Sequence, residues 1–190
     1  MSELKTARLD RRQLAKAVSL GAVAALAGGK AIAAGNDLDN TVYMQLKYGR
    51  VVIRLRPDLA PKTVAQIKTL VKQGFYNGLT FHRVIDGFMA QTGDPTGTGM
   101  GGSKLPDVPA EFTNAPFERG TLGMARASDP NSGNSQFFIC FAPAPFLDGK
   151  YTVFGQVVSG MKYVDKIKRG EPPPHPDKII SMTMASDAKK

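Results

Sequence analysis

Residues 81–94 read Phe-His-Arg-Val-Ile-Asp-Gly-Phe-Met-Ala-Gln-Thr-Gly-Asp, which places two short, largely apolar runs on either side of Asp86-Gly87. An Asp-Gly pair between two such runs predicts a β-hairpin, because both residues tolerate the left-handed backbone of a tight turn. The stretch therefore predicts two antiparallel strands. It also indicates that antiparallel β-structure is a main component of the fold.

The register of this hairpin decides which side chains share a face, and the sequence leaves two registers open. A two-residue loop would place Arg83 opposite Ala90. A three-residue loop over 86–88 would instead pair Arg83 with Gln91 and leave Met89 on the same face. Because cross-strand partners share a face, the second register would gather a guanidinium, an amide and a thioether in one patch.

A second segment, residues 134–141, combines an apolar strand pattern with a polar side chain and reads Asn-Ser-Gln-Phe-Phe-Ile-Cys-Phe. Strand alternation sends Phe137 and Ile139 to one face, which is a natural core face. The opposite face carries Gln136 beside Phe138. Taken alone, this pattern fits a polar residue near the rim of a barrel as well as it fits a binding groove.

The rest of the chain predicts many short strands and two helices. A hairpin is expected over 42–47 and 51–55, and a helix from Pro61 until Gly74. Further strand-like runs lie at 80–85, 89–92, 121–125, 135–141, 152–158 and 178–184, with a shorter helical stretch at about 160–168. This pattern predicts a mainly β fold, a closed antiparallel β-barrel capped by two α-helices.

Charge and composition exclude several classes of protein. Of the 190 residues, 42% are hydrophobic and 22% charged, which is typical of a globular chain. Six basic and two acidic residues fall within 1–33, so only +5 of the net charge of +9 is spread over the remainder. With no nucleic-acid motif and no aromatic–basic stripe, we expect no nucleic-acid partner. The single cysteine, Cys140, excludes an intramolecular disulfide, and with only His82 and His175 beside it we expect no metal site.

The N-terminus has the layout of an export signal. A basic, polar segment over 1–16 precedes a 12-residue apolar run, 18–29, which is short against the ~20 residues that span a bilayer. The small residues that follow fit cleavage after Ala33, and Arg11-Arg12 resembles a twin-arginine motif. We therefore expect export to the periplasm, with no stable membrane association of the mature domain, 34–190. A general secretory signal or an uncleaved anchor is the alternative.

Two other patterns are weaker. Gly97–Gly102 satisfies the G-x-G-x-x-G dinucleotide pattern, but Pro106 and Pro109 disfavour the helix that must follow it, so a surface loop is expected. No G-x-S-x-G motif occurs, and a Ser/His hydrolase would have to recruit His82 or His175. We expect His82 to be a hydrogen-bonded structural side chain on a strand.

The two segments described first, together with 146–151 and 153–155, closely resemble the cyclophilin family of peptidyl-prolyl cis–trans isomerases. The resemblance runs in order through about residues 42–184. It implies a closed eight-stranded antiparallel β-barrel with two helices, an enzyme that needs no cofactor, and proline-containing polypeptide segments as partners. It also implies a monomer, and it assigns the glycine-rich run to a surface loop of the family.

The resemblance also implies roles for individual residues. Arg83 would donate a hydrogen bond toward the prolyl nitrogen, and Gln91 would hold Arg83 and the substrate carbonyl in place. Proline would enter an apolar pocket of Phe88, Met89, Phe138 and Leu147. The substrate backbone would pair with Ala125, Arg126 and Ala127, and further groove contacts would come from Gln136, Phe146 and Tyr151.

Three positions depart from many eukaryotic members of the family. Phe146 stands where those proteins have Trp, Tyr151 where they have His, and Arg126 where Asn is common. Loss of the indole N–H predicts weak binding of the inhibitor cyclosporin, with isomerase activity retained. Arg126 would add positive charge that favours acidic residues near the proline. Beside the isomerase, the remaining interpretation is a cyclophilin-like chaperone or scaffold whose turnover is incidental.

Overall fold

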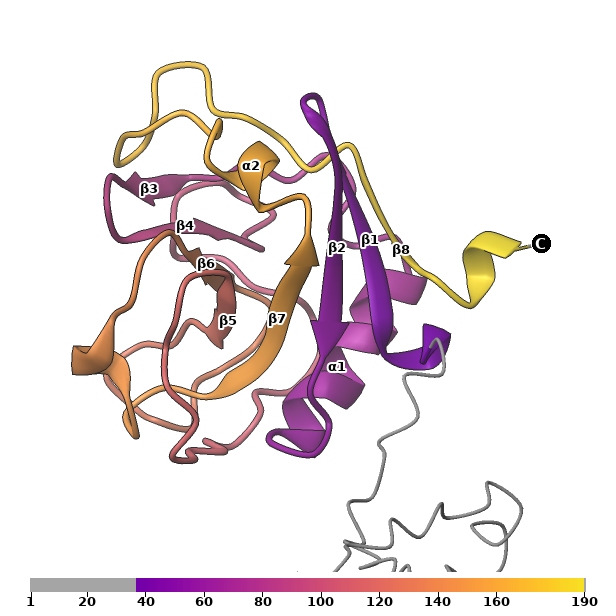
Figure 1. Cartoon of the computed structure of the whole chain (residues 1–190). Helices are drawn as coiled ribbons and strands as arrows, with labels where there is room; N and C mark the ends of the chain where they lie inside the picture. Colours follow the sequence, from indigo (N-terminus) through magenta and orange to yellow (C-terminus); the bar gives the residue numbers. More distant parts are fainter. Residues whose placement is uncertain (1–36, 190) are drawn as a thin grey trace, which may run out of the picture. The chain divides into compact units, whose positions relative to one another are not determined.

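The computed structural model describes residues 37–189, and the expected export signal lies outside them. Eight strands form one antiparallel sheet in the order β3-β4-β6-β5-β7-β2-β1-β8, curled so that helix α1 lies at one end of it (Figure 1). The strands are β1 (Thr41–Leu46), β2 (Gly49–Leu55), β3 (Arg83–Ile85), β4 (Met89–Thr92), β5 (Thr121–Met124), β6 (Phe137–Cys140), β7 (Val153–Ser159) and β8 (Ser181–Met184). The helices are α1 (Pro61–Lys72) and α2 (Met161–Val164), with short 3-10 turns η1 (Leu38–Asn40), η2 (Pro145–Leu147) and η3 (Asp187–Lys189). A mainly β chain with two helices was expected, and this is confirmed.

The first hairpin follows the alternation in its sequence. Val42, Met44 and Leu46 are buried, while the residues between them are half exposed. Gly49 closes the turn at a φ of +143°, and a Cβ there would lie 2.6 Å from the ring of Tyr163. The turn therefore needs glycine both for its backbone conformation and for the space that the tyrosine ring occupies.

Helix α1 begins at Pro61 as the sequence predicts, since proline has no N–H to leave unpaired in the first turn. The carboxylate of Glu111, 48 residues away, accepts the amides of Lys62 and Thr63 at 3.0 and 2.8 Å and so caps the helix from outside. The apolar face of α1, which includes Val64 and Ile67, is buried against the sheet.

Helix α2 is shorter than the stretch 160–168 that the sequence suggested. The amide of Asp165 makes a helical bond to Met161 at 3.0 Å, but the next two amides, those of Lys166 and Ile167, bond three residues back to Tyr163 and Val164 at 3.3 and 3.0 Å. The carbonyl of Asp165 instead accepts the guanidinium of Arg169 at 2.9 Å. The change from four-residue to three-residue spacing at Lys166 and Ile167 ends the α-helix.

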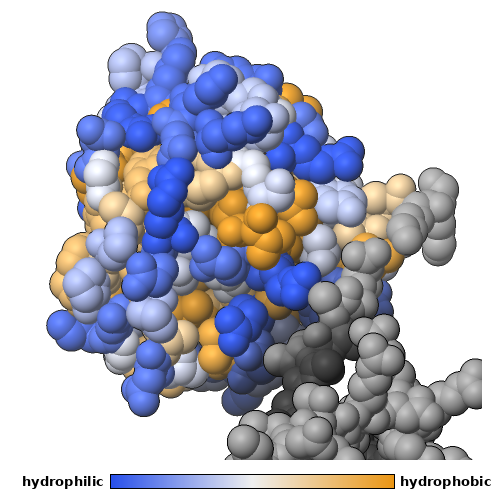
Figure 2. All heavy atoms as spheres, in the orientation of Figure 1, coloured by the Kyte–Doolittle hydropathy of each residue, from blue (hydrophilic) through white to orange (hydrophobic). Residues whose placement is uncertain are grey.

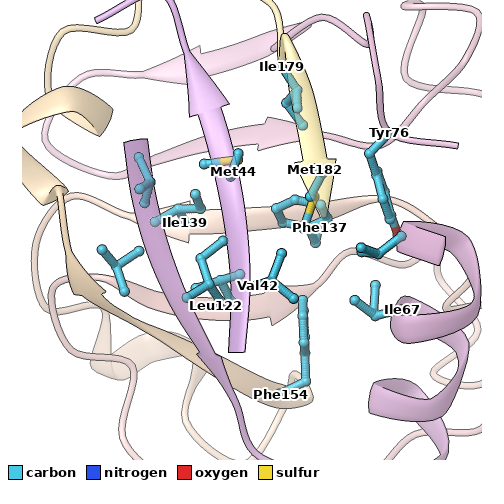
Figure 3. Close-up of a cluster of buried hydrophobic side chains, with 14 of the residues drawn as sticks. Val42, Met44, Ile67, Tyr76, Leu122, Phe137, Ile139, Phe154, Ile179 and Met182 are labelled. Atoms are coloured by element: carbon cyan, nitrogen blue, oxygen red, sulfur yellow. The ribbon is translucent and has the colours of Figure 1, made fainter. Parts of the chain in front are cut away.

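The two faces of β6 separate two apolar clusters. Phe137 and Ile139 are fully buried in the main core between the sheet and α1 (Figure 3), where the ring of Phe137 packs edge-on against Tyr76 with centroids 5.5 Å apart. The Tyr76 hydroxyl donates to the Ser135 carbonyl at 3.0 Å. Phe138 and Cys140 point the other way, into a smaller cluster that also contains Met89. The alternation predicted for residues 136–141 is therefore present.

The expected closed barrel is wrong in one respect, because the sheet is open between its edge strands β3 and β8. The segments 78–81 and 177–179, which precede these strands, meet through an isolated bridge between Thr80 and Lys178 and through three backbone bonds, one of them of 2.9 Å from the Phe81 amide to the Asp177 carbonyl. The edge strands β3 and β8 themselves have three and four residues and do not pair with each other.

Surface apolar residues on the face seen in Figure 2 come in patches separated by hydrophilic side chains. Within residues 37–189 no helix has the length and hydropathy needed to cross a membrane.

Candidate active site

The hairpin over 81–94 adopts the three-residue loop. Arg83 pairs with Gln91, and Ile85 pairs with Met89. Gly87 has a φ of +68°, and the Phe88 amide returns to the Ile85 carbonyl at 3.1 Å. Of the two registers that the sequence left open, the structure therefore has the one that brings the guanidinium, the amide and the thioether to one face.

This face continues across the sheet. Gln91 pairs with Phe138 on β6, and Phe138 pairs with Gly123 on β5, so that Arg83, Gln91, Phe138 and Gly123 form one row. A Cβ at Gly123 would lie 2.3 Å from the Phe138 ring. Glycine at this position gives the ring the space to lie flat against β5.

A groove with a volume of about 860 Å³ lies over this row. Ten of the residues expected to form the site line it: Arg83, Phe88, Met89, Gln91, Ala125, Arg126, Phe138, Phe146, Leu147 and Tyr151. Six lining residues were not singled out as site residues: His82, Gly97, Thr98, Gly99, Glu171 and Pro172. The site residues thus come from four separate parts of the chain, together with loop residues that local sequence patterns did not point to.

A second hollow of about 480 Å³ adjoins the first and shares Gln91, Ala125 and Arg126 with it. The two remaining expected residues, Ala127 and Gln136, line this hollow and not the larger groove. Its other walls come from the glycine-rich segment and from 132–134. The groove and the hollow together could hold an extended peptide.

A chain of hydrogen bonds crosses the groove. Arg83 Nε donates to Glu171 at 2.8 Å, and Arg83 Nη1 donates to Gln91 Oε1 at 3.4 Å. Gln91 Nε2 donates to Gln136 Oε1 at 2.9 Å, and Gln136 Nε2 donates to the carbonyls of Gly99 and Gly101 at 2.9 and 2.8 Å. Because a guanidinium only donates and a carbonyl only accepts, both amides can have one orientation alone.

The floor of the groove is apolar. Phe138 is 5% exposed and stacks on Phe117 with ring centroids 5.7 Å apart, while Met89 and Leu147 are also buried beside it. Phe146 lies at the rim, 59% exposed, with its ring 5.2 Å from that of Phe88. An apolar ring of the size of proline would find hydrophobic walls here and a cation at the edge.

The edge formed by 125–127 is partly occupied by internal bonds. The Ala125 amide donates to the Gln136 carbonyl at 3.0 Å, and the Ala127 amide donates to Ser132 Oγ at 2.8 Å. These bonds engage the amides of both alanines. The backbone of Arg126, which lies between them, is therefore the part of this edge that can pair with a peptide.

Comparison with known proteins is consistent with this geometry. The model of the cyclophilin type peptidyl-prolyl cis-trans isomerase family matches residues 41–184. The chain belongs to the cyclophilin family. A probable peptidyl-prolyl cis-trans isomerase of Brucella suis is 54% identical over 91% of this chain and 93% of its own length, and a peptidyl-prolyl cis-trans isomerase of Helicobacter pylori is 45% identical over 71% and 85%.

Solved cyclophilins share the fold. One from Hirschia baltica has a TM-score of 0.74 and 33% identity, covering 80% of this chain and 76% of its own. One from Cryptosporidium parvum, crystallised in the presence of the dipeptide Ala-Pro, has a TM-score of 0.70 and 31% identity, covering 76% and 98%. This cyclophilin is a peptidyl-prolyl cis–trans isomerase.

His82 differs from its expected role. The side chain is 5% exposed, and neither ring nitrogen has a hydrogen-bond partner among the described residues. It precedes β3 and lines the groove beside Gly99. Burial of the imidazole lowers its pKa, so the ring is neutral near pH 7. The predicted hydrogen bond and the predicted position on a strand are therefore wrong, and the buried ring forms part of the groove wall of this cyclophilin.

The glycine-rich segment of this cyclophilin is a loop held by Asp94, and no helix follows it. The carboxylate accepts the amides of Thr96, Thr98 and Gly99 at 2.7, 3.0 and 2.6 Å. Burial acts to raise the pKa of Asp94, but these hydrogen bonds outweigh it and bring the pKa to about 2. The ionised carboxylate therefore organises the loop whose carbonyls anchor Gln136.

Neither a reactive thiol nor a metal site is found among the described residues. Cys140 is buried, and burial raises the pKa of its thiol to about 12, so the thiolate is absent at neutral pH. Within the described part of the chain, no group of His, Cys, Asp and Glu side chains has a geometry that would hold a metal ion.

Proposed function

We propose that this cyclophilin accelerates rotation about X-Pro bonds of exported proteins as they fold in the periplasm, with Arg83 as its catalytic residue. The observation that carries the assignment of Arg83 is the anchoring of its guanidinium. Nε binds Glu171 and Nη1 approaches Gln91, while Nη2 has no hydrogen-bond partner among the described residues. Nη2 is therefore the group available to a peptide in the groove that Arg83 lines.

The chemistry requires no nucleophile and no proton transfer. Rotation about an X-Pro bond is slow because the amide C–N bond has partial double-bond character, with a barrier of ~18–20 kcal/mol. A donor aimed at the prolyl nitrogen stabilises that atom as it becomes pyramidal, which favours the twisted transition state over either planar isomer. Arg suits this task because it stays charged and its donors lie in a fixed plane.

The remaining site residues would bind and orient the peptide. The proline ring would lie on Phe138 between Met89, Leu147 and Phe88, which form the apolar end of the groove. Gln91, held in one orientation by the hydrogen-bond chain, would present its amide to the carbonyl beside the proline. The peptide backbone would follow the segment 125–127 toward the hollow beside Gln136. The Cryptosporidium protein crystallised with Ala-Pro supports proline-containing segments as the partners.

The decisive experiment is cis–trans exchange of an X-Pro peptide, measured by NMR with the mature protein and its Arg83→Ala variant. Loss of a preorganised donor is expected to slow catalysed exchange by ~10²–10³. Arg54→Ala is a matched control, since this arginine is exposed on β2 and does not line the groove. Exchange that is equally fast in Arg83→Ala would overturn the assignment.

The same experiment separates the second candidate function, a chaperone or scaffold. If the folded protein binds the peptide but leaves exchange at the uncatalysed rate, holding proline segments is its role.

The export proposal is supported by the charge and apolar pattern of residues 1–33. Fractionation of cells that express the full chain is expected to place the protein in the periplasm, shortened to a start near Ala34. Replacing Arg11 and Arg12 by Lys is expected to retain it in the cytoplasm, because the twin-arginine route requires that pair. Export that is unaffected by this change would point to the general secretory route.

A further inference from the structure

Glu171 is the one acidic residue among those that line the larger groove, and it comes from a loop far from the other site residues in the sequence. The loop follows α2 and runs beside β3 (Figure 1). The Glu171 carboxylate lies 2.8 Å from Arg83 Nε, although 88 positions separate the two residues.

The backbone places this carboxylate opposite Arg83. Val84 and Gly170, the neighbours of the two charged residues, form an isolated antiparallel bridge with reciprocal bonds of 2.8 Å. Gly170 has a φ of +143°, and a Cβ there would lie 2.5 Å from Pro173. The bridge and the tight loop together hold Glu171 beside the strand that carries Arg83.

A second ion pair lies on the other side of the same bridge. Arg169 Nε donates to Asp86 at 3.0 Å, and its guanidinium lies 4.1 Å from the centroid of the Phe141 ring. Two ion pairs therefore attach the loop to the hairpin: the loop supplies the acid in one, Glu171, and the base in the other, Arg169. Only one of them, at Glu171, contacts the groove arginine.

The bond to Glu171 is the stronger of the two that orient the guanidinium. It joins two opposite charges at 2.8 Å, whereas the bond from Nη1 to Gln91 is long, at 3.4 Å. Both bonds come from the charged guanidinium, but only Glu171 offers an ionised acceptor, and only its bond lies within the usual range of distances. The pair is 43% and 52% exposed, so it contributes little to the stability of the fold. Its effect is on the direction in which the Arg83 donors point.

We propose that Glu171 is a positioning residue for Arg83: its carboxylate holds Nε so that Nη2 faces the prolyl nitrogen. This rests on the proposed catalytic role of Arg83. Glu171 acts through the guanidinium and not on the peptide, so its removal changes the rate of exchange more than the affinity for the peptide.

The test measures catalysed exchange and peptide affinity separately, by NMR exchange and by titration. Glu171→Ala is expected to slow exchange roughly tenfold, less than the loss of the donor itself, because the guanidinium remains but is no longer aligned. Peptide affinity should stay within about twofold, which is under ~0.5 kcal/mol. Glu171→Gln keeps an oxygen acceptor for Nε and is expected to restore most of the rate.

Asp86→Ala is the matched control, because it removes the companion ion pair without touching Arg83. Unchanged exchange in Asp86→Ala would support positioning. A loss equal to that of Glu171→Ala would show that both residues merely attach the loop, which overturns the proposal.

A double variant connects the effect to Arg83. In the Arg83→Ala background, Glu171→Ala is expected to cause no further loss, since residues that act through one another are not additive. If Glu171→Ala lowers the exchange rate by the same factor in both backgrounds, the inference is overturned while the proposed function stays intact. If Arg83→Ala itself exchanges at the normal rate, the proposed function fails first, so the two failures are distinguishable.

Discussion

The guanidinium of Arg126 lies over the ring of Tyr151, 4.5 Å from its centroid, and joins the two sides of the groove. Its nitrogens donate to the carbonyls of Ala127 and Lys150 at 2.9 and 3.2 Å. Tyr151 in turn packs edge-on against Phe138 on the groove floor, at 6.0 Å. Two of the three positions that depart from many eukaryotic cyclophilins are therefore in contact with each other.

This contact predicts that Tyr151 supports the peptide-binding edge through its ring. Tyr151→Ala is expected to weaken peptide binding about two- to fivefold, since a cation–π contact at an exposed site contributes ~0.5–1 kcal/mol. Tyr151→Phe keeps the ring and should retain most of the affinity. Titration of both variants with one X-Pro peptide checks this, and equal losses in the two would contradict it.

The same contact bears on the expected preference for acidic residues near proline. Nη1 and Nη2 of Arg126 are engaged by backbone carbonyls, so we expect only a small difference between peptides that carry Glu or Lys beside the X-Pro pair. Exchange rates for the two peptides, compared in the protein and in Arg126→Ala, measure this preference. A large preference for Glu that disappears in the variant would show that the guanidinium leaves Tyr151 to meet the substrate.

Phe146 provides a prediction about the inhibitor. Its ring is at the exposed rim of the groove and has no hydrogen-bond donor. Phe146→Trp is expected to tighten cyclosporin binding several-fold, because a net hydrogen bond contributes ~0.5–1.5 kcal/mol. Isomerase activity should be retained, since Arg83 is unaffected. Unchanged affinity for cyclosporin in a folded Phe146→Trp protein would contradict the prediction.

Gly123 links packing to the site. A methyl group here would meet the rings of Phe138 and Phe117 at 2.3 and 2.7 Å. Gly123→Ala is expected to destabilise the protein by about 1–3 kcal/mol, as overpacked cores do, and to weaken peptide binding because the groove floor is displaced. Thermal unfolding and titration measure the two effects. Normal values for both would show that the rings move aside without cost.

Asp94 sets a dependence of stability on pH. Its pKa in the folded protein is lowered to about 2, below the ordinary value of 3.8. Its contribution to stability is therefore fully present above pH 4 and is lost as the pH falls toward 2. Asp94→Asn replaces one acceptor oxygen by an NH2 group, which leaves part of the loop amides without an acceptor. We therefore expect a lower melting temperature at pH 7 and a weaker dependence on pH between 4 and 2. If the melting temperatures of Asp94→Asn and of the native protein are equal at pH 7 and fall equally between pH 4 and 2, the prediction is contradicted.

Much of the fold was predictable because it depends on local alternation. The strand pattern over 42–46 and the first turn of α1 at Pro61 reflect the spacing of apolar residues and the geometry of proline. The length of α2 was not predictable, since it ends where the amides of Lys166 and Ile167 bond three residues back instead of four. Whether the sheet closes was not predictable either, because closure depends on how Thr80 and Lys178, 98 positions apart, meet.

The long motifs at 81–94 and 134–141 were enough to identify the family, and strand alternation was enough to assign Arg83, Gln91 and Phe138 to strands. The folded chain was needed for three further features: the hairpin register, the groove-facing position of His82 and the contact of Glu171 with Arg83. The physical reason is that alternation along a strand is a local property of the chain. A contact between a loop and a strand 88 residues away forms only when the whole sheet has brought their backbones together.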